Sequence, residues 1–540
     1  MNPSPRLFRL AAVGLALSCP LTKAADPIKL QFNVPMRDGV RLATDVWLPD
    51  TNHALPVIFL RFPYNKDLGV GLGRDGAARG YAVVVQDTRG RFKSEGANLP
   101  FFQDATDGED SVAWINQQPW SNHKVGTFGG SAGAITQFQM VTRGSGPVTA
   151  QHLTVGAPNI YDVVYTGGVL RKSLVEDWIR ATQFAPAALP TWVSHPVYDD
   201  YWRAQDASRH YADIHAPAVH IGGYWDIFAQ PTIDAFVGYQ NRGGTGARGK
   251  QKLILGPWSH GVLQEKVGEL NFPGGKTPPN KVHDHWRWFD YALKGATGDA
   301  ANWPAVTYYV IGDTSDPQAP GNLWRTATAW PPVPTTPTKF YLNGDHSLAT
   351  TSAKGPVSLS YDYDPHTPTP TVGGIQLTLP AGPRDQILVE SRPDVLVFTT
   401  DALTAPVEVT GRVQAKLWIA SDAPDTDFFV RLCDVYPDGR SYNLCEGMLR
   451  ARFRDGVDRE RFLTPGKVYP ITVDCWSTSV IFNRGHRIRV QVTSSSFPGF
   501  DPNPNTGEPL RASDRTRVAH NTIYADPRHP SHVILPVAAK

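Results

Sequence analysis

The chain has few cysteines for its length, only 4 in 540 residues. Cys19 lies in an apolar N-terminal segment, which leaves Cys433, Cys445 and Cys475 for the rest of the protein. Three thiols form at most one intrachain disulfide, so a disulfide-stabilised scaffold is excluded. A bridge between Cys433 and Cys445 would close a hairpin, and the sequence leaves that pairing open.

An excess of charge of one sign is also absent. Lys and Arg together number 52, and Asp and Glu number 50. Removal of residues 1–24 would leave 49 basic and 50 acidic residues, a net charge close to −1. Such a balance offers no electrostatic attraction to nucleic acid or to anionic lipid. We therefore expect neither as a partner.

Long hydrophobic runs are missing as well. The apolar run Leu10–Leu17 is too short to span a bilayer, and no later segment is long enough. The run follows two arginines and precedes the small-residue site Thr22-Lys23-Ala24. This order predicts an export signal over residues 1–24 and a secreted or periplasmic protein.

A lipid anchor at Cys19 is the competing interpretation of the N-terminus. The residues before it are Ala16-Leu17-Ser18, and a leucine is expected where Ala16 stands. We therefore favour cleavage after residue 24 over anchoring.

Short, continuously apolar runs alternate with helical stretches such as Asp107–Gln117 over the first half of the chain. Before them, residues 28–49 alternate around an Asp-Gly turn and predict an antiparallel hairpin. Runs of this length suit strands of a parallel sheet buried on both faces. The pattern predicts a doubly wound α/β sheet that binds ligands at the carboxyl ends of its strands. The runs are Val57–Leu60, Tyr81–Val85, Val125–Phe128, Leu153–Val155, Ala218–Ile221 and Leu253–Leu255.

Two segments depart from this α/β pattern. Residues 145–213 are rich in helix formers and tryptophan, which predicts a helical cap over the sheet. After a helix at His285–Leu293, proline clusters and alternating strands predict a β-sandwich or jelly roll. We thus expect an α/β catalytic domain over 25–144 and 214–300, with the jelly-roll domain over 301–540.

The segment Lys124–Gly133, KVGTFGGSAG, contains Gly-x-Ser-x-Gly between an apolar run and a helical stretch. A nucleophile elbow needs that order, because small residues around Ser131 let strand and helix approach closely. With 48 glycines in the chain, the motif alone is weak, and a glycine-rich turn with an idle serine is the alternative.

An elbow serine requires a histidine to take its proton and a carboxylate to orient that histidine. In α/β-hydrolases the acid and then the histidine follow the serine along the chain. Asp226 comes just after one predicted buried strand, and His260 just after the next. The sequence therefore predicts a triad of Ser131, Asp226 and His260.

The oxyanion of the reaction needs two hydrogen-bond donors. One candidate is the backbone N–H of Ala132, and the second is the hydroxyl of Tyr64, in the loop after an early strand. An ordinary interface tyrosine is the alternative interpretation of Tyr64.

The chain resembles the α/β-hydrolase family (CocE/NonD) of cocaine esterase, the α-amino-acid ester hydrolases, glutaryl-cephalosporin acylases and X-Pro dipeptidyl peptidases. The resemblance implies Ser131 as nucleophile, Asp226 as orienting acid, His260 as base, and Tyr64 hydroxyl with Ala132 N–H as the oxyanion hole. It also implies the three-part architecture predicted above. Matching stretches cover nearly all of the chain after residue 24 and include MRDGVRLATDVWLP, LRFPYNK, VVVQDTRGRFKSEG, PWSNHKVGTFGGSAG, HPVYDDYW, GGYWDIF, LILGPWSH, WFDYALKG and VYPDGRSYNLCEGMLRARFR.

The α-amino-acid ester hydrolases bind a substrate ammonium with carboxylates, two of which follow the catalytic acid. Here Asp226 is followed by Ile227, Phe228 and Ala229, with no carboxylate. Glu176 and Asp177 in the cap could replace them, although a solvated helix face is the simpler interpretation.

The residues around the triad indicate instead an apolar or aromatic acyl pocket. We expect Phe228 and Trp225 in its wall, with Gly130 beside the nucleophile. Trp178, Trp192 and Trp202 of the cap fit a pocket wall or a cap core equally well.

Two further patterns indicate no cofactor. His283 and His285 precede Asp290 without a third metal ligand at a suitable spacing, so we interpret them as surface histidines. Gly69–Gly73 lacks the Lys-Ser/Thr of a phosphate-binding loop, and we interpret it as a flexible loop near Tyr64. We expect neither a metal nor an organic cofactor.

These observations predict an exported serine hydrolase that cleaves small-molecule carboxylic esters, with amides as further substrates, through an acyl-enzyme. The alternatives are an X-Pro dipeptidyl peptidase or an α-amino-acid ester hydrolase or β-lactam acylase. A remote alternative is a glycan-binding protein on an inactive hydrolase scaffold. The sequence leaves the physiological substrate and the oligomeric state open, and a homodimer or homotetramer is compatible with it.

Overall fold

The computed structural model describes residues 26–50, 52–142 and 148–539. The predicted export signal over 1–24 and Cys19 lie outside the described residues. Within these ranges, no helix has the length and apolar character needed to cross a membrane.

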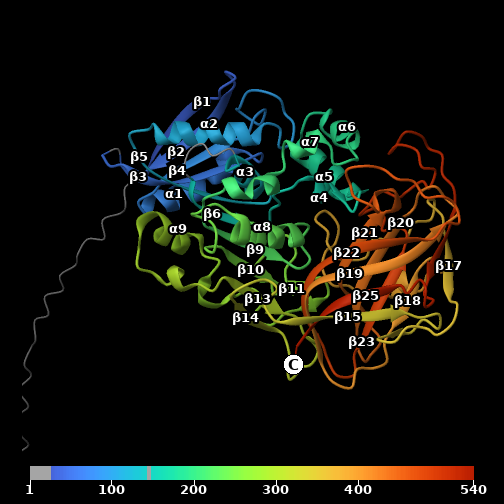
Figure 1. Ribbon diagram of the computed structural model, residues 1–540. Helices are drawn as coiled ribbons and strands as arrows, with labels where there is room; N and C mark the ends of the chain where they lie inside the picture. Colours follow the sequence, from blue (N-terminus) through green and yellow to red (C-terminus); the bar gives the residue numbers. More distant parts are fainter. Residues whose placement is uncertain (1–25, 51, 143–147, 540) are drawn as a thin grey trace, which may run out of the picture.

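A ten-stranded mixed sheet forms the N-terminal part of the molecule (Figure 1). Seven neighbouring strands, from β4 to β13 in the sheet, are parallel, and antiparallel strands flank them on both edges. Each of the six apolar runs in the sequence overlaps one of these strands. In sheet order they are β1 (Ile28–Pro35), β2 (Arg41–Leu48), β4 (Ala82–Asp87), β3 (Leu55–Phe62), β5 (Ser121–Gly130), β6 (Val148–Thr154), β9 (Ala218–Gly223), β10 (Lys252–Gly256), β13 (Val306–Val310) and β14 (Leu323–Ala327).

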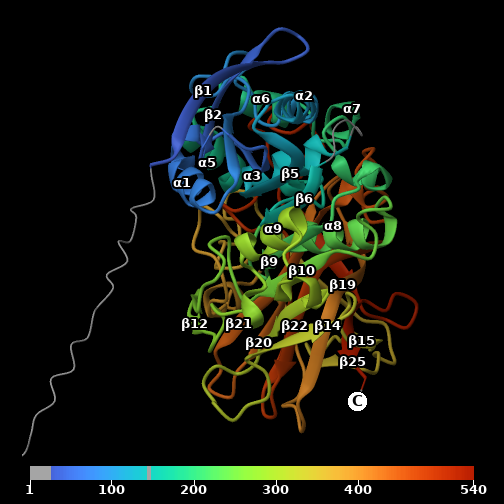
Figure 2. The ribbon, with the colours of Figure 1, turned by 90° about the vertical axis from the view of Figure 1, so that its left-hand side faces the viewer.

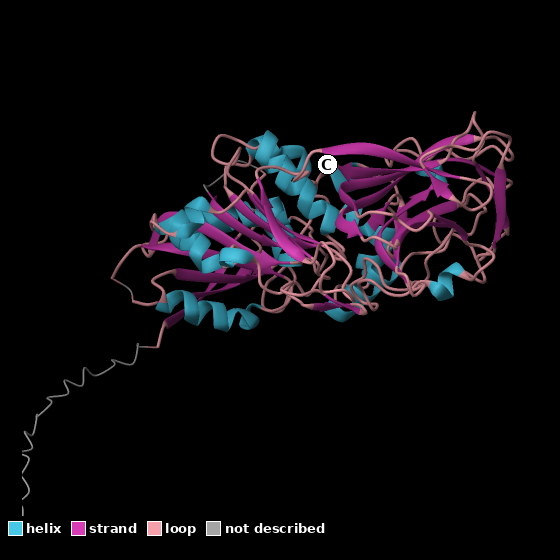
Figure 3. Cartoon of the chain, turned by 90° about the horizontal axis from the view of Figure 1, so that it is seen from below, coloured by secondary structure: helices cyan, strands magenta, loops and turns pink. Residues whose placement is uncertain are grey.

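Helices cover both faces of this sheet (Figure 3). The helices α1 (Val70–Ala78) and α9 (His285–Lys294) share one buried cluster. On the other face, α2 (Asp104–Asn116), α3 (Ala132–Met140) and α8 (Ala229–Arg242) contribute to two more clusters. This arrangement is the α/β organisation that the alternating runs predict.

Helix α9 shows why these sequences form these elements. Asp284 caps its first turn by accepting from the backbone N–H groups of Trp286 and Arg287. Gly295 ends it in a left-handed conformation with φ 70°, as the Lys-Gly pair predicts. Trp286 and Phe289 are buried against the sheet because they share one face of the helix.

The glycine-rich segment Gly69–Gly73 is helical, and the expectation of a flexible loop is wrong. It spans the end of η1 (Lys66–Gly69) and the first turn of α1. A Cβ at Gly73 would lie 2.4 Å from the Trp47 ring, so the glycine lets this helix pack closely on the sheet.

The cap contains short helices between β6 and β9, and α5 is its longest (Figure 1). It begins later than predicted, because residues 148–154 form strand β6 between β5 and β9 of the large sheet. Its elements are α4 (Tyr161–Val164), the hairpin β7 (Tyr165–Thr166) and β8 (Val169–Leu170), α5 (Lys172–Thr182), α6 (Ala188–Val193), α7 (Asp200–Arg203) and η2 (Ala207–Asp213).

The large sheet also continues past the predicted boundary at residue 300. Strand β13 pairs parallel to β10, and β14 pairs antiparallel to β13. The sequence VTYYV of β13 is a buried apolar run like the earlier six. Between β10 and β13 lie β11 (Lys266–Val267), β12 (Leu270–Asn271), η3 (Pro279–Lys281), α9 and η4 (Asp299–Asn302).

The C-terminal part consists almost entirely of antiparallel strands in a seven-stranded and a four-stranded sheet (Figure 2). The alternating segments that predict strands here overlap β19, β20, β22 and β23; they are Val413–Ile419, Phe428–Val435, Val468–Val473 and Ile488–Val492. The larger sheet contains β15 (Thr335–Leu342), β16 (Leu348–Ala349), β17 (Ser358–Tyr363), β19 (Val407–Ser421), β22 (Tyr469–Phe482), β24 (Ala519–Tyr524) and β25 (His532–Ala538). The smaller sheet contains β18 (Leu396–Thr399), β20 (Asp427–Val435), β21 (Ser441–Arg450) and β23 (Arg487–Thr493), and the short helices are α10 (Ile387–Glu390) and η5 (Ala451–Phe453).

The two parts of the molecule share one hydrophobic core. The cluster that fills the space between the C-terminal sheets extends without interruption to Leu253 of β10 and Tyr308 of β13. In addition, Ile311 at the end of β13 exchanges backbone hydrogen bonds with Ser479 and Ile481 of β22, at 2.9 and 2.8 Å.

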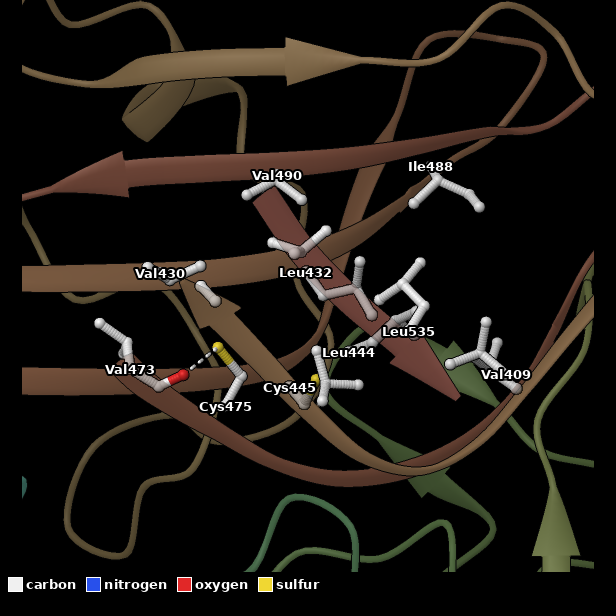
Figure 4. Packing of buried hydrophobic residues seen from close by; sticks show 14 of the residues in the cluster. Val409, Val430, Leu432, Leu444, Cys445, Val473, Cys475, Ile488, Val490 and Leu535 are labelled. Carbon is white, nitrogen blue, oxygen red and sulfur yellow. Dashed lines mark hydrogen bonds between the residues drawn. The ribbon is translucent and has the colours of Figure 1, made fainter. Parts of the chain in front are cut away.

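The three described cysteines are free, buried thiols. Cys445 and Cys475 pack among Val430, Leu432 and Val473 (Figure 4). A bridge between Cys433 and Cys445, which the sequence left open, does not form. A bulge in the β20–β21 pairing sets Cys433 opposite Asn443 and Cys445 opposite Leu432.

Candidate active site

Ser131 lies between strand β5 and helix α3 in a strained backbone conformation, with φ 57° and ψ −125°. Its backbone N–H donates to the carbonyls of Thr154 and Val155, at 3.0 and 3.1 Å. A Cβ at Gly129 would stand 2.8 Å from the Gly133 carbonyl, so this turn requires a glycine there. Such strain persists only where the surrounding structure enforces it, and this geometry is that of a nucleophile elbow.

His260 lies between Ser131 and Asp226. Its Nδ1 is 2.6 Å from Asp226 Oδ2, and its Nε2 is 3.1 Å from Ser131 Oγ. Because a carboxylate only accepts, Nδ1 carries the proton, and Nε2 is left to accept from the serine hydroxyl. Residues from three strand ends thus form one continuous hydrogen-bonded chain.

The environment of His260 sets its basicity. Burial disfavours the imidazolium, but the charge of Asp226 and its hydrogen bond outweigh this and raise the pKa of His260. Asp226 is fully buried, and its other carboxylate oxygen accepts from the Phe228 backbone N–H at 2.7 Å. The carboxylate is therefore held in one orientation toward the ring.

Tyr64 follows β3 and reaches the same point as Ser131 and Ala132. Burial raises the pKa of the Tyr64 hydroxyl, while hydrogen bonding with Trp178, with the Ser131 side chain and with the Ala132 amide lowers it in part. The Trp178 indole Nε1 donates to the Tyr64 oxygen at 3.0 Å. The phenol thus remains protonated beside the serine, where it can act as a hydrogen-bond donor.

The loop that carries Tyr64 is fixed on both sides. Arg91 Nε donates to the carbonyl of Pro63 at 3.0 Å, and Asp87 accepts from the backbone N–H of Lys66 at 2.6 Å. Arg89 instead pairs with carboxylates of the first hairpin and of α2. We therefore interpret Asp87, Arg89 and Arg91 as structural residues of this loop.

A cavity of about 410 Å³, partly open to solvent, begins at Ser131. No wall residue carries a charge, and Leu377 comes from the C-terminal part. Phe228 lines the cavity as expected, and so do Trp178 and Trp192, whereas Trp202 is buried in the cap core. The wall consists of Phe101, Ser131, Ala132, Ile135, Ile160, Val163, Val164, Leu174, Val175, Trp178, Trp192, Ile227, Phe228 and Leu377.

Trp225 does not line this cavity, so the prediction that it does is wrong. Its ring is fully buried, stacks on Phe272 at 5.4 Å, and donates to the Asn443 carbonyl at 3.2 Å. The Trp225 side chain points toward the C-terminal sheets, whereas that of Asp226 points toward His260. Gly130 is also absent from the wall and is exposed at the end of β5.

The carboxylates proposed as ammonium acceptors are already paired. Glu176 accepts from Lys172 at 2.7 Å and from Arg511 at 2.6 Å. Asp177 pairs with Arg180 on the exposed side of α5. Neither residue contributes to the cavity wall.

His283 and His285 are half-buried packing residues, and their interpretation as surface histidines is wrong. Burial lowers the pKa of both, and the His285 ring lies 4.5 Å from that of Phe128. Asp290 accepts from Tyr81 and Lys294 instead of facing them. Across the described ranges, no group of three or more His, Cys, Asp and Glu side chains is arranged to hold a metal ion.

Known proteins of the family inferred from the sequence motifs match nearly the whole chain. Residues 38–188 and 176–262 match the X-Pro dipeptidyl-peptidase (S15) family, and residues 299–534 match the X-Pro dipeptidyl-peptidase C-terminal non-catalytic domain. Cocaine esterase from Rhodococcus sp. (strain MB1 Bresler) is 34% identical over 572 residues, covering 93% of this chain and 97% of that protein.

Solved structures share the fold at lower identity. An aminopeptidase from a marine-sediment Thaumarchaeota archaeon superposes with a TM-score of 0.81 at 23% identity, over 100% of this chain and 99% of that one. An α-amino acid ester hydrolase gives 0.74 at 24% identity, over 98% of both chains. The resemblance inferred from sequence motifs is thus confirmed, and the chain belongs to the cocaine esterase/X-Pro dipeptidyl-peptidase (CocE/NonD) family of α/β-hydrolases and is a serine hydrolase.

Proposed function

We propose that the protein cleaves carboxylic esters, with amides as further substrates, through a Ser131–His260–Asp226 triad and an acyl-enzyme. The observation that carries this proposal is the pair of contacts from His260, 2.6 Å to Asp226 and 3.1 Å to Ser131. In that arrangement the imidazole can take the hydroxyl proton while the buried carboxylate stabilises the imidazolium.

The reaction then follows from the positions of the donors. Ser131 Oγ attacks the ester carbonyl as its proton passes to His260 Nε2. The negative oxygen accepts hydrogen bonds from the Ala132 N–H and the Tyr64 hydroxyl. His260 next protonates the leaving alcohol, and later activates the water that hydrolyses the acyl-enzyme.

The cavity favours an apolar or aromatic acyl group that carries no charge. A substrate ammonium would enter a wall of aliphatic and aromatic side chains without a carboxylate to pair with. Glu176 cannot serve as one without breaking its pairs with Lys172 and Arg511. This argument favours simple ester hydrolysis over the dipeptidyl-peptidase and α-amino-acid ester hydrolase alternatives.

The same proposal includes the parts of the chain outside the site. We propose export directed by residues 1–24, a cap from 155 to 213 that covers the cavity, and a jelly-roll arrangement of the C-terminal sheets. Leu377 supports a role for those sheets at the site, because it brings one of their loops into the cavity wall.

Replacing Ser131 with alanine tests the function directly. Turnover of p-nitrophenyl phenylacetate should fall by about 10⁴-fold or more, and labelling by a fluorophosphonate probe should disappear. The exposed cap residue Ser194 offers a matched control, and Ser194→Ala should retain both. Undiminished turnover in Ser131→Ala would refute the proposal, and an unlabelled wild-type protein would favour the glycan-binding alternative.

Substrate pairs separate the enzyme alternatives. Phenylalanine p-nitroanilide and methyl ester should be poorer substrates with a free α-amine than with an acetylated one, because the cavity has no ammonium acceptor. A clear preference for the free amine would instead support the peptidase or α-amino-acid ester hydrolase alternative.

A further inference from the structure

Trp178 makes two different contacts at the site. Its indole N–H donates to the Tyr64 oxygen at 3.0 Å, while its ring forms part of the cavity wall. The ring is nearly parallel to two others, with Phe101 at a centroid distance of 5.6 Å and an angle of 4°, and Trp192 at 6.0 Å and 8°. These stacks fix the direction in which the N–H points.

The direction of this hydrogen bond determines what the Tyr64 hydroxyl can do. An indole N–H only donates, so the Tyr64 oxygen must be the acceptor. The single phenolic proton is then directed away from the Trp178 N–H. Of the other two neighbours of the oxygen, only the Ser131 hydroxyl can accept this proton, because the Ala132 N–H also donates. A phenol that accepts a hydrogen bond is also a stronger donor, because successive hydrogen bonds polarise one another.

The helix that carries Trp178 is anchored at both ends. Toward its N-terminus, Arg171 donates to the Ile375 carbonyl at 3.1 Å, and Arg511 binds Glu176 at 2.6 Å, so the C-terminal part holds this end. At the other end, Arg91 donates to the carbonyls of Thr182 and Gln183.

Arg91 also connects this helix with the loop of Tyr64. The same guanidinium that binds the end of α5 donates to the carbonyl of Pro63, the residue before Tyr64, at 3.0 Å. The donor Trp178 and the acceptor Tyr64 are therefore held on one frame, which keeps their separation fixed.

We propose that Trp178 is a positioning residue of the reaction, whose indole N–H orients the Tyr64 hydroxyl toward the oxyanion while its ring supports the acyl group. The inference rests on the proposed function, in which Tyr64 is an oxyanion donor. It implies that acyl binding and oxyanion stabilisation depend on the same side chain. A substrate that packs well against the Trp178 ring should therefore be favoured in kcat as well as in KM.

A double-mutant cycle tests the inference with p-nitrophenyl phenylacetate as the probe. Trp178→Phe keeps an aromatic wall but removes the N–H, and kcat should fall about tenfold with KM changed by less than about threefold. Tyr64→Phe should lower kcat by about 10²–10³-fold. In the Tyr64→Phe background, Trp178→Phe should lower kcat by less than about twofold, because no hydroxyl remains to be oriented.

Trp192 is the matched control for the cycle. It lines the same cavity and stacks on Trp178, but its indole N–H donates to Tyr201 at 3.2 Å instead of Tyr64. Trp192→Phe keeps a ring against Trp178 and leaves the Trp178–Tyr64 hydrogen bond in place, so its effect on kcat should depend on the Tyr64 hydroxyl much less than the effect of Trp178→Phe does. Replacing Trp178 with β-(3-benzothienyl)alanine removes the N–H at constant shape and should lower kcat as Trp178→Phe does. This variant keeps the test valid if the Trp178→Phe protein folds poorly.

The inference is overturned if Trp178→Phe lowers kcat equally in both backgrounds, or if the benzothienyl variant retains wild-type kcat. A loss below tenfold in Tyr64→Phe would instead remove Tyr64 from the oxyanion hole, and with it the basis of the inference. Failure of the proposed function would be seen in a different experiment, because ester turnover would then persist in Ser131→Ala.

Discussion

Two imidazoles, His152 on a strand of the large sheet and His260 in the loop after β10, have opposite acid–base properties. His260 contacts the Asp226 carboxylate at 2.6 Å, and its pKa is raised. His152 on β6 faces the rings of Phe128 and His285, and burial lowers its pKa to about 3. Its Nε2 lies 3.2 Å from the carbonyl of His283, and its Nδ1 has no hydrogen-bond partner among the described residues.

The difference shows that burial by itself makes a histidine inert rather than reactive. His220 on β9 is a second example, because its partner is the uncharged Gln251 and burial lowers its pKa to about 4. Of these three imidazoles, only that of His260 has a carboxylate partner. The position of one acid therefore separates a candidate catalytic base from a packing residue.

Removing that acid should make His260 resemble His152. In Asp226→Asn the amide no longer stabilises the imidazolium and favours the wrong tautomer, so kcat for ester hydrolysis should fall about 10⁴-fold. Asp234→Asn on helix α8 is a matched control and should stay within a few-fold of wild type. A hundredth or more of wild-type kcat in Asp226→Asn would mean that the carboxylate has no such role.

The pH dependence of kcat/KM should report the raised pKa of His260. The imidazole must be neutral to accept the serine proton, so activity should fall about tenfold per pH unit below that pKa, which lies above 6.5. In the residual activity of Asp226→Asn, the acid limb of the pH profile should move to lower pH. The pKa of His260 falls in this variant because the imidazole stays buried while the negative charge of Asp226 is lost. A profile that is flat down to pH 5 would contradict this assignment.

The smallest expected effect concerns stability at acid pH. His152 is neutral when folded and protonates near pH 6.5 when unfolded, so its contribution is complete above pH 6.5 and is lost as the pH falls toward 3. Wild type should lose roughly 1 kcal/mol per pH unit from this residue alone between pH 6 and 4. His260, with its raised pKa, acts in the opposite sense and loses its contribution as the pH rises through that pKa.

Urea unfolding of His152→Gln at pH 7 and pH 5 provides the measurement. Glutamine keeps a donor for the His283 carbonyl but does not titrate, so its midpoint should fall less on acidification than that of wild type. Equal falls in the two proteins would show that His152 does not contribute to the acid sensitivity.

Much of the site could be predicted because its residues follow a simple rule of parallel sheets. Ser131, Asp226 and His260 each come just after a buried apolar run, and such runs end on the same edge of the sheet. The rule gives the edge but not the direction of each side chain. For that reason the sequence placed Asp226 and Trp225 at the same edge as Ser131 but did not show that the Trp225 side chain points away from the cavity.

Contacts between distant segments could not be predicted in this way. Leu377 enters the cavity wall from a loop with no distinguishing pattern, and Trp178 has the same sequence signal whether it packs or donates to Tyr64. The boundary at residue 300 was misplaced because it was set just after the helix His285–Leu293, whereas two more strands of the first sheet follow that helix. Pairing, not composition, assigns β13 and β14 to the first sheet.

The shared core limits how this protein can be divided for engineering. A fragment that ends near residue 300 would lose β13 and β14, leave the edge of β10 unpaired, and strip the covering from Trp225 and Leu253. An open apolar edge of this kind invites aggregation through strand addition. Truncation or domain exchange should therefore keep residues 26–539 together, and variation is best confined to the cap, where the chain leaves and re-enters the sheet between neighbouring strands.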